Sequence, residues 1–535
     1  MSFTRTAVVE IRNRIARALD DPAEAASIRI ITLDALAWAV QSGYSNDAKL
    51  TGSFDDNIDR ARHLIRNDPD VRDDLARVEH LIVDEAQDII GRRADLILTI
   101  IDALNPEAGI SVFADRAQAI YDFSENRDET GATNLLEELE ERGFRQLQLT
   151  TVHRTKDPNL LAIFTDLRRE LLAGGRKDLE QHMRREIRRL AHADAGRAAD
   201  LRIDKLSEDT LVLMRSRLDV LIASSYAGLH PHRLRLSGLP ICIRPWPAHL
   251  FWDFTSRRIT RSEFEKRWHD RNVQAPFGCD EAWQRCFEVA AESRLVLDLH
   301  RLRMALARSN PPMLFCSPEF GLAGPILGTI HASKGREAST VYLFLQERMA
   351  ADETGEEARV LFVGATRPRD RLLVGTAGIA HGQYTQDRVW RRTGNNIQVE
   401  VGRPFDIEPA GLVGRPFFSS QEKALAAQHA WIAQPLRDHM AIRAEEPLGW
   451  RFVLSSGDQR LAGMSEGFRM DISRIAYQLQ KNIVWFGHGR SMGLRTMVVL
   501  PDSPVLENML EPWKSSGFLF APLLSSLSLA PLRSR

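Results

Sequence analysis

The sequence predicts an α/β fold built on parallel sheets. Short apolar runs recur along the chain and are typical of strands buried on both faces. The clearest are residues 81–83, 110–114 and 210–214. A helix is expected at residues 91–105, between the first two runs. The first run ends in Asp84 and Glu85, and metal and catalytic groups gather at the carboxyl edge of a parallel sheet. An ordinary solvated turn is the alternative interpretation of this acidic pair.

Length and composition indicate a globular protein of several domains. The 535 residues suggest three or four domains, and 44% of them are hydrophobic and 27% charged. The net charge of −1 means that any contact with nucleic acid must come from a local patch. The four cysteines form no CxxC pair, which argues against a zinc site or a disulfide framework and favours a reducing cytoplasm. There is no apolar run near 18 residues, so no membrane span is expected.

Further motifs follow the acidic pair in a fixed order. They are Asp84-Glu85-x-Gln87-Asp88, Asp115-x-x-Gln118-x-x-Tyr121, His153-Arg154, Thr329-x-His331-x-x-Lys334-Gly335-x-Glu337 and Thr366-Arg367. This order resembles that of the UvrD-like superfamily 1 helicases, and the resemblance covers roughly residues 1–375.

The resemblance implies that two RecA-like P-loop NTPase lobes with parallel sheets bind ATP and Mg²⁺ between them. Asp84 and Glu85 would hold the metal, and Glu85 would also polarise the attacking water. Gln118 would sense the terminal phosphate, and Arg154 and Arg367 would stabilise its charge. The other nucleotide-binding residues implied are Gln87, Asp115, Gly335 and Glu337, the last at the ribose. Taken alone, Arg154 fits a surface ion pair, and Arg367 fits a helix C-terminal arginine that interacts with the helix dipole.

The resemblance also implies single-stranded and duplex DNA as partners. The DNA-contacting positions would be Phe3, Thr4, Arg5, Thr32, Tyr121, Phe123, Thr329 and His331. Phe123 would stack on a base, a contact of about 1–3 kcal/mol that does not read sequence; a core position is its alternative. The implied activity is a cytoplasmic, ATP-dependent DNA helicase or translocase with 3′→5′ polarity, of the kind used in DNA repair.

The sequence departs from the family at the phosphate loop. That loop ends in Gly-Lys-Ser/Thr and holds the phosphates, whereas no Gly-Lys dipeptide occurs in the 535 residues. We therefore expect an N-terminally truncated chain whose autonomous activity is in doubt. The alternatives are a catalytically incomplete DNA-binding or regulatory remnant, and one subunit of a split helicase whose Walker A segment comes from a separate chain.

Composition and motif order together suggest domain boundaries. The first lobe is expected at 1–146 with a small, helical insertion at about 41–75, the second lobe at 147–224 and 321–378, an inserted accessory subdomain at 225–320, and a C-terminal α+β module of unassigned role at 379–535. Residues 147–149 should open the second lobe as a strand. The arginine-rich stretch 168–189 is expected to be a solvated helix. Thr260 and Glu263 form a capping-box signature, which predicts a helix start. The C-terminal aromatic residues, Trp485, Phe486, Trp513, Phe518 and Phe520, are expected to pack in a core.

Overall fold

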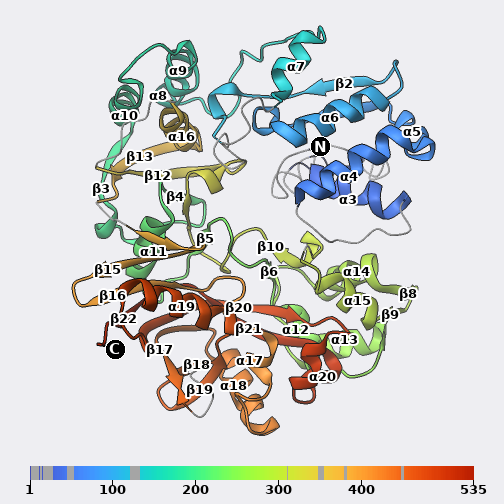
Figure 1. Cartoon of the computed structure of the whole chain (residues 1–535), viewed down its shortest axis with the longest axis vertical. Coiled ribbons are helices and arrows are strands. Elements are labelled where there is room, and N and C mark those ends of the chain that lie inside the picture. The colour runs from blue at the N-terminus through green and yellow to red at the C-terminus, as the bar shows by residue number, and fades with distance from the viewer. Residues whose placement is uncertain are drawn as a thin grey trace. The chain divides into compact units, whose positions relative to one another are not determined.

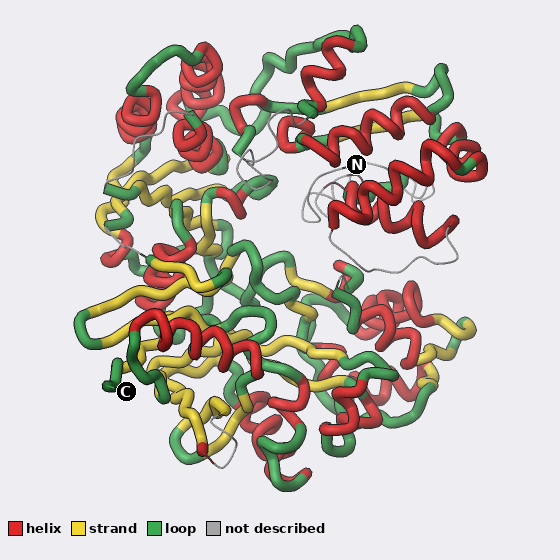
Figure 2. Tube along the Cα trace, viewed as in Figure 1, coloured by secondary structure: helices red, strands yellow, loops and turns green. Residues whose placement is uncertain are grey.

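The computed structural model describes residues 1, 11, 15, 28–44, 54–120, 133–309, 311–347, 355–378, 382–446 and 451–534, and every structural statement below concerns these residues. By its contacts the chain divides into two compact units (Figures 1 and 2). Unit 1 comprises Met1–His192, Lys334–Glu337 and Ala350–Leu372, and unit 2 comprises Ala193–Ser333, Ala338–Met349 and Leu373–Arg535.

Unit 1 contains a parallel strand pair covered by helices. Strand β1 (His80–Val83) pairs in parallel with β2 (Gly109–Val112), and helix α6 (Gly91–Ala103) connects them. The predicted strand-helix-strand order is therefore confirmed. The predicted burial on both faces is wrong for these two strands, because Ile82 on β1 is 48% exposed and no residue of β2 is fully buried. Leu81 and Val83 on β1 are buried, and they join the apolar side of α6 in one core. The other α-helices described in this unit are α3 (Leu33–Tyr44), α4 (Phe54–Asn67), α5 (Pro69–Ala76), α7 (Leu135–Glu141), α8 (Pro158–Ala162), α9 (Arg168–Ala173), α10 (Leu179–Leu190) and α16 (Glu356–Ala365).

The strand expected at residues 147–149 is absent, so this prediction was wrong. Leu147 and Leu149 are 72% and 86% exposed, in an extended stretch that pairs with no described strand. Alternating leucines favour a strand only where a neighbouring edge supplies hydrogen bonds and a surface to bury them.

Unit 2 contains a six-stranded sheet in the order β3-β13-β12-β4-β11-β5. Its strands are β3 (Ala193–Arg197), β13 (Pro368–Thr376), β12 (Ala338–Leu345), β4 (Thr210–Met214), β11 (Ile326–Thr329) and β5 (Arg233–Arg235). The pairs β3–β13, β12–β4, β4–β11 and β11–β5 are parallel. Every residue of β4 is buried, as the apolar run predicted, and helix α11 (Arg217–Tyr226) packs nearby in the same core. Parallel sheets in both units confirm the α/β class.

The segment between β5 and β11 packs around an apolar core that also includes Phe518 from the C-terminal part of the chain. It contains β6 (Cys242–Ile243), α12 (Trp246–Phe251), β7 (Arg258–Thr260), α13 (Arg261–Asp270), α14 (Cys279–Ala290), β8 (Ala291–Ser293), β9 (Val296–Asp298), α15 (Leu299–Leu306) and β10 (Cys316–Ser317). Helix α13 begins at the predicted place, because the Thr260 hydroxyl oxygen accepts a hydrogen bond of 3.3 Å from the Glu263 backbone N–H.

The C-terminal part forms a nine-stranded sheet in the order β14-β15-β16-β22-β20-β17-β18-β19, with β21 paired to β20. Its pairings are antiparallel. The strands are β14 (Gln383–Thr385), β15 (Arg388–Thr393), β16 (Asn396–Val401), β17 (Leu436–Glu445), β18 (Arg451–Ser456), β19 (Gln459–Gly463), β20 (Trp485–Val498), β21 (Phe518–Leu524) and β22 (Ser526–Pro531), and the α-helices are α17 (Pro409–Val413), α18 (Gln421–Ala433), α19 (Glu466–Leu479) and α20 (Trp513–Ser516). This part therefore combines helices with an antiparallel sheet, as the predicted α+β class requires. Phe486, Trp513, Phe518 and Phe520 are buried as expected, whereas Trp485 is only partly buried.

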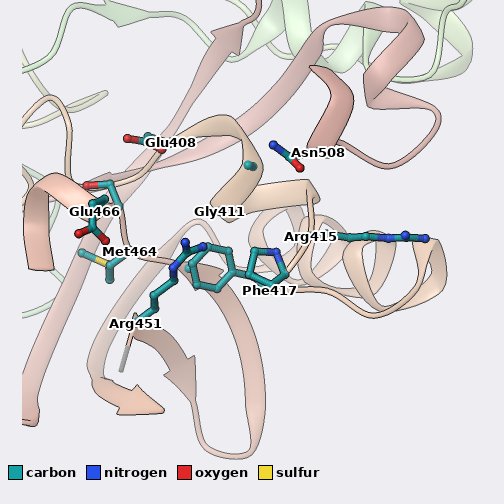
Figure 3. A pocket seen from close by; sticks show the side chains of 12 residues that line it. Glu408, Gly411, Arg415, Phe417, Arg451, Met464, Glu466 and Asn508 are labelled. Atoms are coloured by element: carbon teal, nitrogen blue, oxygen red, sulfur yellow. The ribbon is translucent and has the colours of Figure 1, made fainter. Parts of the chain in front are cut away.

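A pocket of about 430 Å³ lies in this C-terminal module (Figure 3). Phe417 and Met464 are its buried apolar residues, and Arg451 and Glu466 bring charges to it. In Figure 3 the side chain of Arg415 points away from the other labelled side chains. No helix in the described part of the chain is both long and apolar enough to cross a membrane.

Candidate nucleotide site

The acidic motif lies at the carboxyl end of β1, where the sequence predicted it. The chain turns sharply there, and Glu85 has a φ of 56°, a left-handed conformation that residues with a Cβ rarely adopt. A turn of this kind costs on the order of 1–3 kcal/mol, which the surrounding contacts must offset. Gln87 supplies two such contacts. Its Nε2 donates to Glu85 Oε2 at 2.5 Å, and its Oε1 accepts from the Asp115 backbone N–H at 2.9 Å.

Asp84 and Glu85 form a pair of adjacent carboxyl groups that suits a cation. Burial raises the pKa of the Asp84 carboxyl, and the neighbouring Glu85 carboxylate raises it further. Mg²⁺ is often bound by one or two protein carboxylates, with water and substrate phosphates as its other ligands. The described residues contain no group of three or more acidic, histidine or cysteine side chains that could hold a metal. Two carboxyl groups are enough for a Mg²⁺ ion whose other ligands are water and substrate phosphates.

Lys334 joins the acidic motif to the glutamine motif. Its ammonium group donates to the Asp88 carboxylate and, at 2.8 Å, to the Gln118 backbone oxygen. The same nitrogen lies 3.5 Å from Glu85 Oε2. Both Lys334 and Asp88 are buried, so this ion pair lies largely out of water. Residues more than two hundred positions apart in the sequence thus meet within unit 1.

The two predicted phosphate arginines lie in the same contact network. Arg367 follows α16 and is 2% exposed, and its Nη2 donates to Gln118 Oε1 at 2.6 Å. Burial lowers the pKa of Arg367 to about 10, with Arg154 acting in the same direction, so the guanidinium remains charged at neutral pH. Arg154 donates to the Thr366 backbone oxygen at 2.8 Å and pairs with Glu337 Oε1 at 2.7 Å.

Two arginines join this network without having been predicted. Arg168 pairs with Asp115 Oδ1 at 2.9 Å, and Arg359 donates to the Ala119 backbone oxygen at 2.8 Å. Arg168 belongs to the stretch that was expected to be a solvated helix. Its side chain is 41% exposed, so Arg168 is partly solvated, as expected, and partly in contact with Asp115. The sequence around Arg168 has the same pattern of charges whether all of its arginines face solvent or one of them pairs within the protein. The sequence therefore held no signal for the contact with Asp115.

The other predicted residues are distributed more widely. Gly335 is exposed, with a φ of 72°. Thr32 is buried, and its hydroxyl oxygen accepts a hydrogen bond from the Ala35 backbone N–H at the start of α3. Thr329 and His331 belong to unit 2, where burial lowers the pKa of His331 to about 4. The residues that lie outside the described part of the chain are Phe3, Thr4, Arg5, Tyr121 and Phe123.

The motif residues 329–337 and 366–367 lie in a stretch that matches a known family. Residues 326–374 match the family model of the UvrD-like helicase C-terminal domain. The chain resembles a superfamily 1 helicase. The family resemblance inferred from the motif order is confirmed by this helicase-like segment, residues 326–374. Among solved structures, the chain is similar to the Pif1 helicase from Candida albicans, with 13% identity, a TM-score of 0.31, and coverage of 70% of this chain and 89% of that one. No curated protein matches the sequence.

Proposed function

We propose that this chain is an ATP-dependent DNA helicase or translocase of UvrD type that moves 3′→5′ on single-stranded DNA. The contact network within unit 1 is the main support. Direct contacts or shared neighbours join four residues in it: Glu85, Gln118, Arg154 and Arg367. The motif order had assigned these four residues to steps of one reaction. The helicase-like segment contributes Arg367 to this network.

The chain's own residues can be given roles from their contacts. Gln87 orients the Glu85 carboxylate through Oε2, so that Oε1 would accept a proton from the attacking water. Arg367 brings a guanidinium group to Gln118, and Arg154 brings a second one to the backbone oxygen of the adjacent Thr366. Both would stabilise charge on a phosphoryl group. When bound, ATP with Mg²⁺ would supply that phosphoryl group, and Asp84 and Glu85 would hold the metal.

DNA-stimulated ATP hydrolysis tests the proposal. We expect hydrolysis by the wild type to rise with single-stranded DNA and to fall to background in Glu85→Gln. Glu107→Gln is the matched control, because Glu107 is exposed on the loop before β2 and should leave the rate unchanged. Background rates in all three proteins would contradict an autonomous ATPase.

A second candidate is a DNA-binding remnant or one subunit of a split helicase. The 535 residues contain no Gly-Lys dipeptide, so a phosphate loop would have to come from outside them. A filter-binding titration distinguishes the outcomes, because contacts with phosphates make DNA affinity fall steeply with salt. Salt-dependent DNA binding without hydrolysis would indicate a remnant. Hydrolysis restored by a separately supplied chain with a Gly-Lys-Thr loop would indicate a split enzyme.

A further inference from the structure

Two histidines that have been given no role above face each other on the antiparallel sheet of unit 2. His439 lies on β17 and His488 on β20, and these strands pair with register irregularities between Arg437 and Met440 and between Met440 and Ile442. Both histidines have left-handed backbone conformations, with φ of 57° and 60°. The irregular pairing therefore turns both side chains away from the regular alternation of the sheet.

The ring nitrogens have the spacing of two ligands on one metal ion. His439 Nδ1 lies 3.2 Å from His488 Nδ1, and the ring planes are inclined at 67° with centroids 5.3 Å apart. Two nitrogens bound tetrahedrally to one ion, each at about 2.0–2.1 Å, are about 3.3–3.4 Å apart. A side-by-side hydrogen bond is also possible at this distance, but it requires one ring to donate and the other to accept.

A carboxylate lies on the far side of one ring. Asp438 Oδ2 is 3.9 Å from His439 Nε2, and Asp438 Oδ1 accepts a hydrogen bond from the His439 backbone N–H at 2.8 Å. The 3.9 Å distance is longer than a hydrogen bond, so Asp438 acts on the ring through its negative charge, which favours a proton on the outer nitrogen and leaves the inner nitrogen free to bind. Here the inner nitrogen is Nδ1, the atom that faces His488.

We propose that His439 and His488 form a surface site for a divalent transition-metal ion of the copper, nickel and zinc class. Imidazole nitrogens suit these ions, whereas Mg²⁺ and Mn²⁺ prefer oxygen ligands. The His439 side chain is 75% exposed and His488 is also exposed, so water completes the coordination of the ion. The site is open and exchangeable, and its affinities follow the order in which Cu²⁺ exceeds Ni²⁺ and Zn²⁺.

Calorimetric titration of the untagged full chain with CuCl₂, NiCl₂ and MgCl₂ tests this proposal. The informative variants are His439→Asn and His488→Asn, because asparagine tolerates left-handed φ angles and should leave the sheet intact. His300→Asn, on an exposed face of α15, is the matched control. Thermal melting of each variant checks that it is folded.

We expect one Cu²⁺ per chain, weaker Ni²⁺ binding, no Mg²⁺ binding at this site, and loss of the Cu²⁺ isotherm in both histidine variants but not in His300→Asn. Asp438→Asn should weaken Cu²⁺ binding by less than either histidine substitution does, because it removes a nearby negative charge and no ligand. Electron paramagnetic resonance of the Cu²⁺ form should show coupling to two nitrogens. One-to-one binding that persists in either folded histidine variant, or Cu²⁺ affinity in the wild type no higher than in the variants, would overturn the assignment.

Discussion

Replacing Lys334 with Met should destabilise unit 1 more than any single contact in its network would suggest. The Lys334 and Asp88 side chains are only 5% and 2% exposed, and they form an ion pair with each other. Met has nearly the volume of Lys but no charge, so the substitution leaves the Asp88 carboxylate buried without this cation. Breaking a buried ion pair by removing one partner typically costs about 3–5 kcal/mol.

A double-mutant cycle separates this charge effect from a packing effect. Asp88→Asn in the Lys334→Met background removes the buried carboxylate charge, so we expect the double variant to be more stable than Lys334→Met alone. The coupling between the two positions should exceed about 1 kcal/mol, whereas residues without contact would give less than about 0.5 kcal/mol.

Hydrogen exchange measured by mass spectrometry is the suitable assay, because it reports stability locally. A loss of 3 kcal/mol raises the rate of exchange through opening by at least about a hundredfold. We expect this rise in peptides covering β1, β2 and α16, with the antiparallel sheet of unit 2 unchanged. Unchanged exchange in Lys334→Met, or a double variant as unstable as the sum of its parts, would refute the buried-pair argument.

Two further predictions concern unit 2. Burial, with a smaller effect from a nearby arginine, lowers the pKa of His232 to about 4, while its ring contacts the Ser224 hydroxyl at 2.8 Å. Between pH 6.5 and 4 the unfolded state therefore binds a proton that the folded state does not, and stability falls as pH drops, by about 1.4 kcal/mol per pH unit. In urea melts, the unfolding free energy of His232→Asn should depend less steeply on pH than that of the wild type, by the equivalent of one proton. An identical pH dependence in the two proteins would contradict this. Separately, Gly463→Ala places its Cβ 2.2 Å from the buried Phe417 ring, whereas Gly467→Ala meets only Ser465 Oγ at 3.6 Å. We expect Gly463→Ala alone to lose about 1–3 kcal/mol in denaturant melts, and equal stability of the two variants would count against the clash.

Local patterns predicted much of this fold because they act over a few residues. The strand before Asp84 and the fully buried β4 were both predicted from short apolar runs. Burial on both faces holds for β4 but not for β1, where Ile82 is 48% exposed. Thr260 caps α13 because the hydroxyl and the orphan N–H are three residues apart in any such helix start. The motif order likewise pointed to Gln118 and Arg367, and the structure places them 2.6 Å apart.

The tertiary structure alone decided which partners those residues meet. Leucines at 147 and 149 alternate as a strand would, yet no described strand edge pairs with them and they are exposed. Lys334 contacts Asp88, 246 positions away in the sequence, and His439 contacts His488, 49 positions away. No local sequence pattern predicts either contact. The physical reason is range: periodicity and capping are set by neighbours along the chain, whereas an ion pair or a ligand pair depends on how separate elements pack. The sequence by itself therefore determined which kinds of groups this protein carries, and the packing of its elements determined which of them touch.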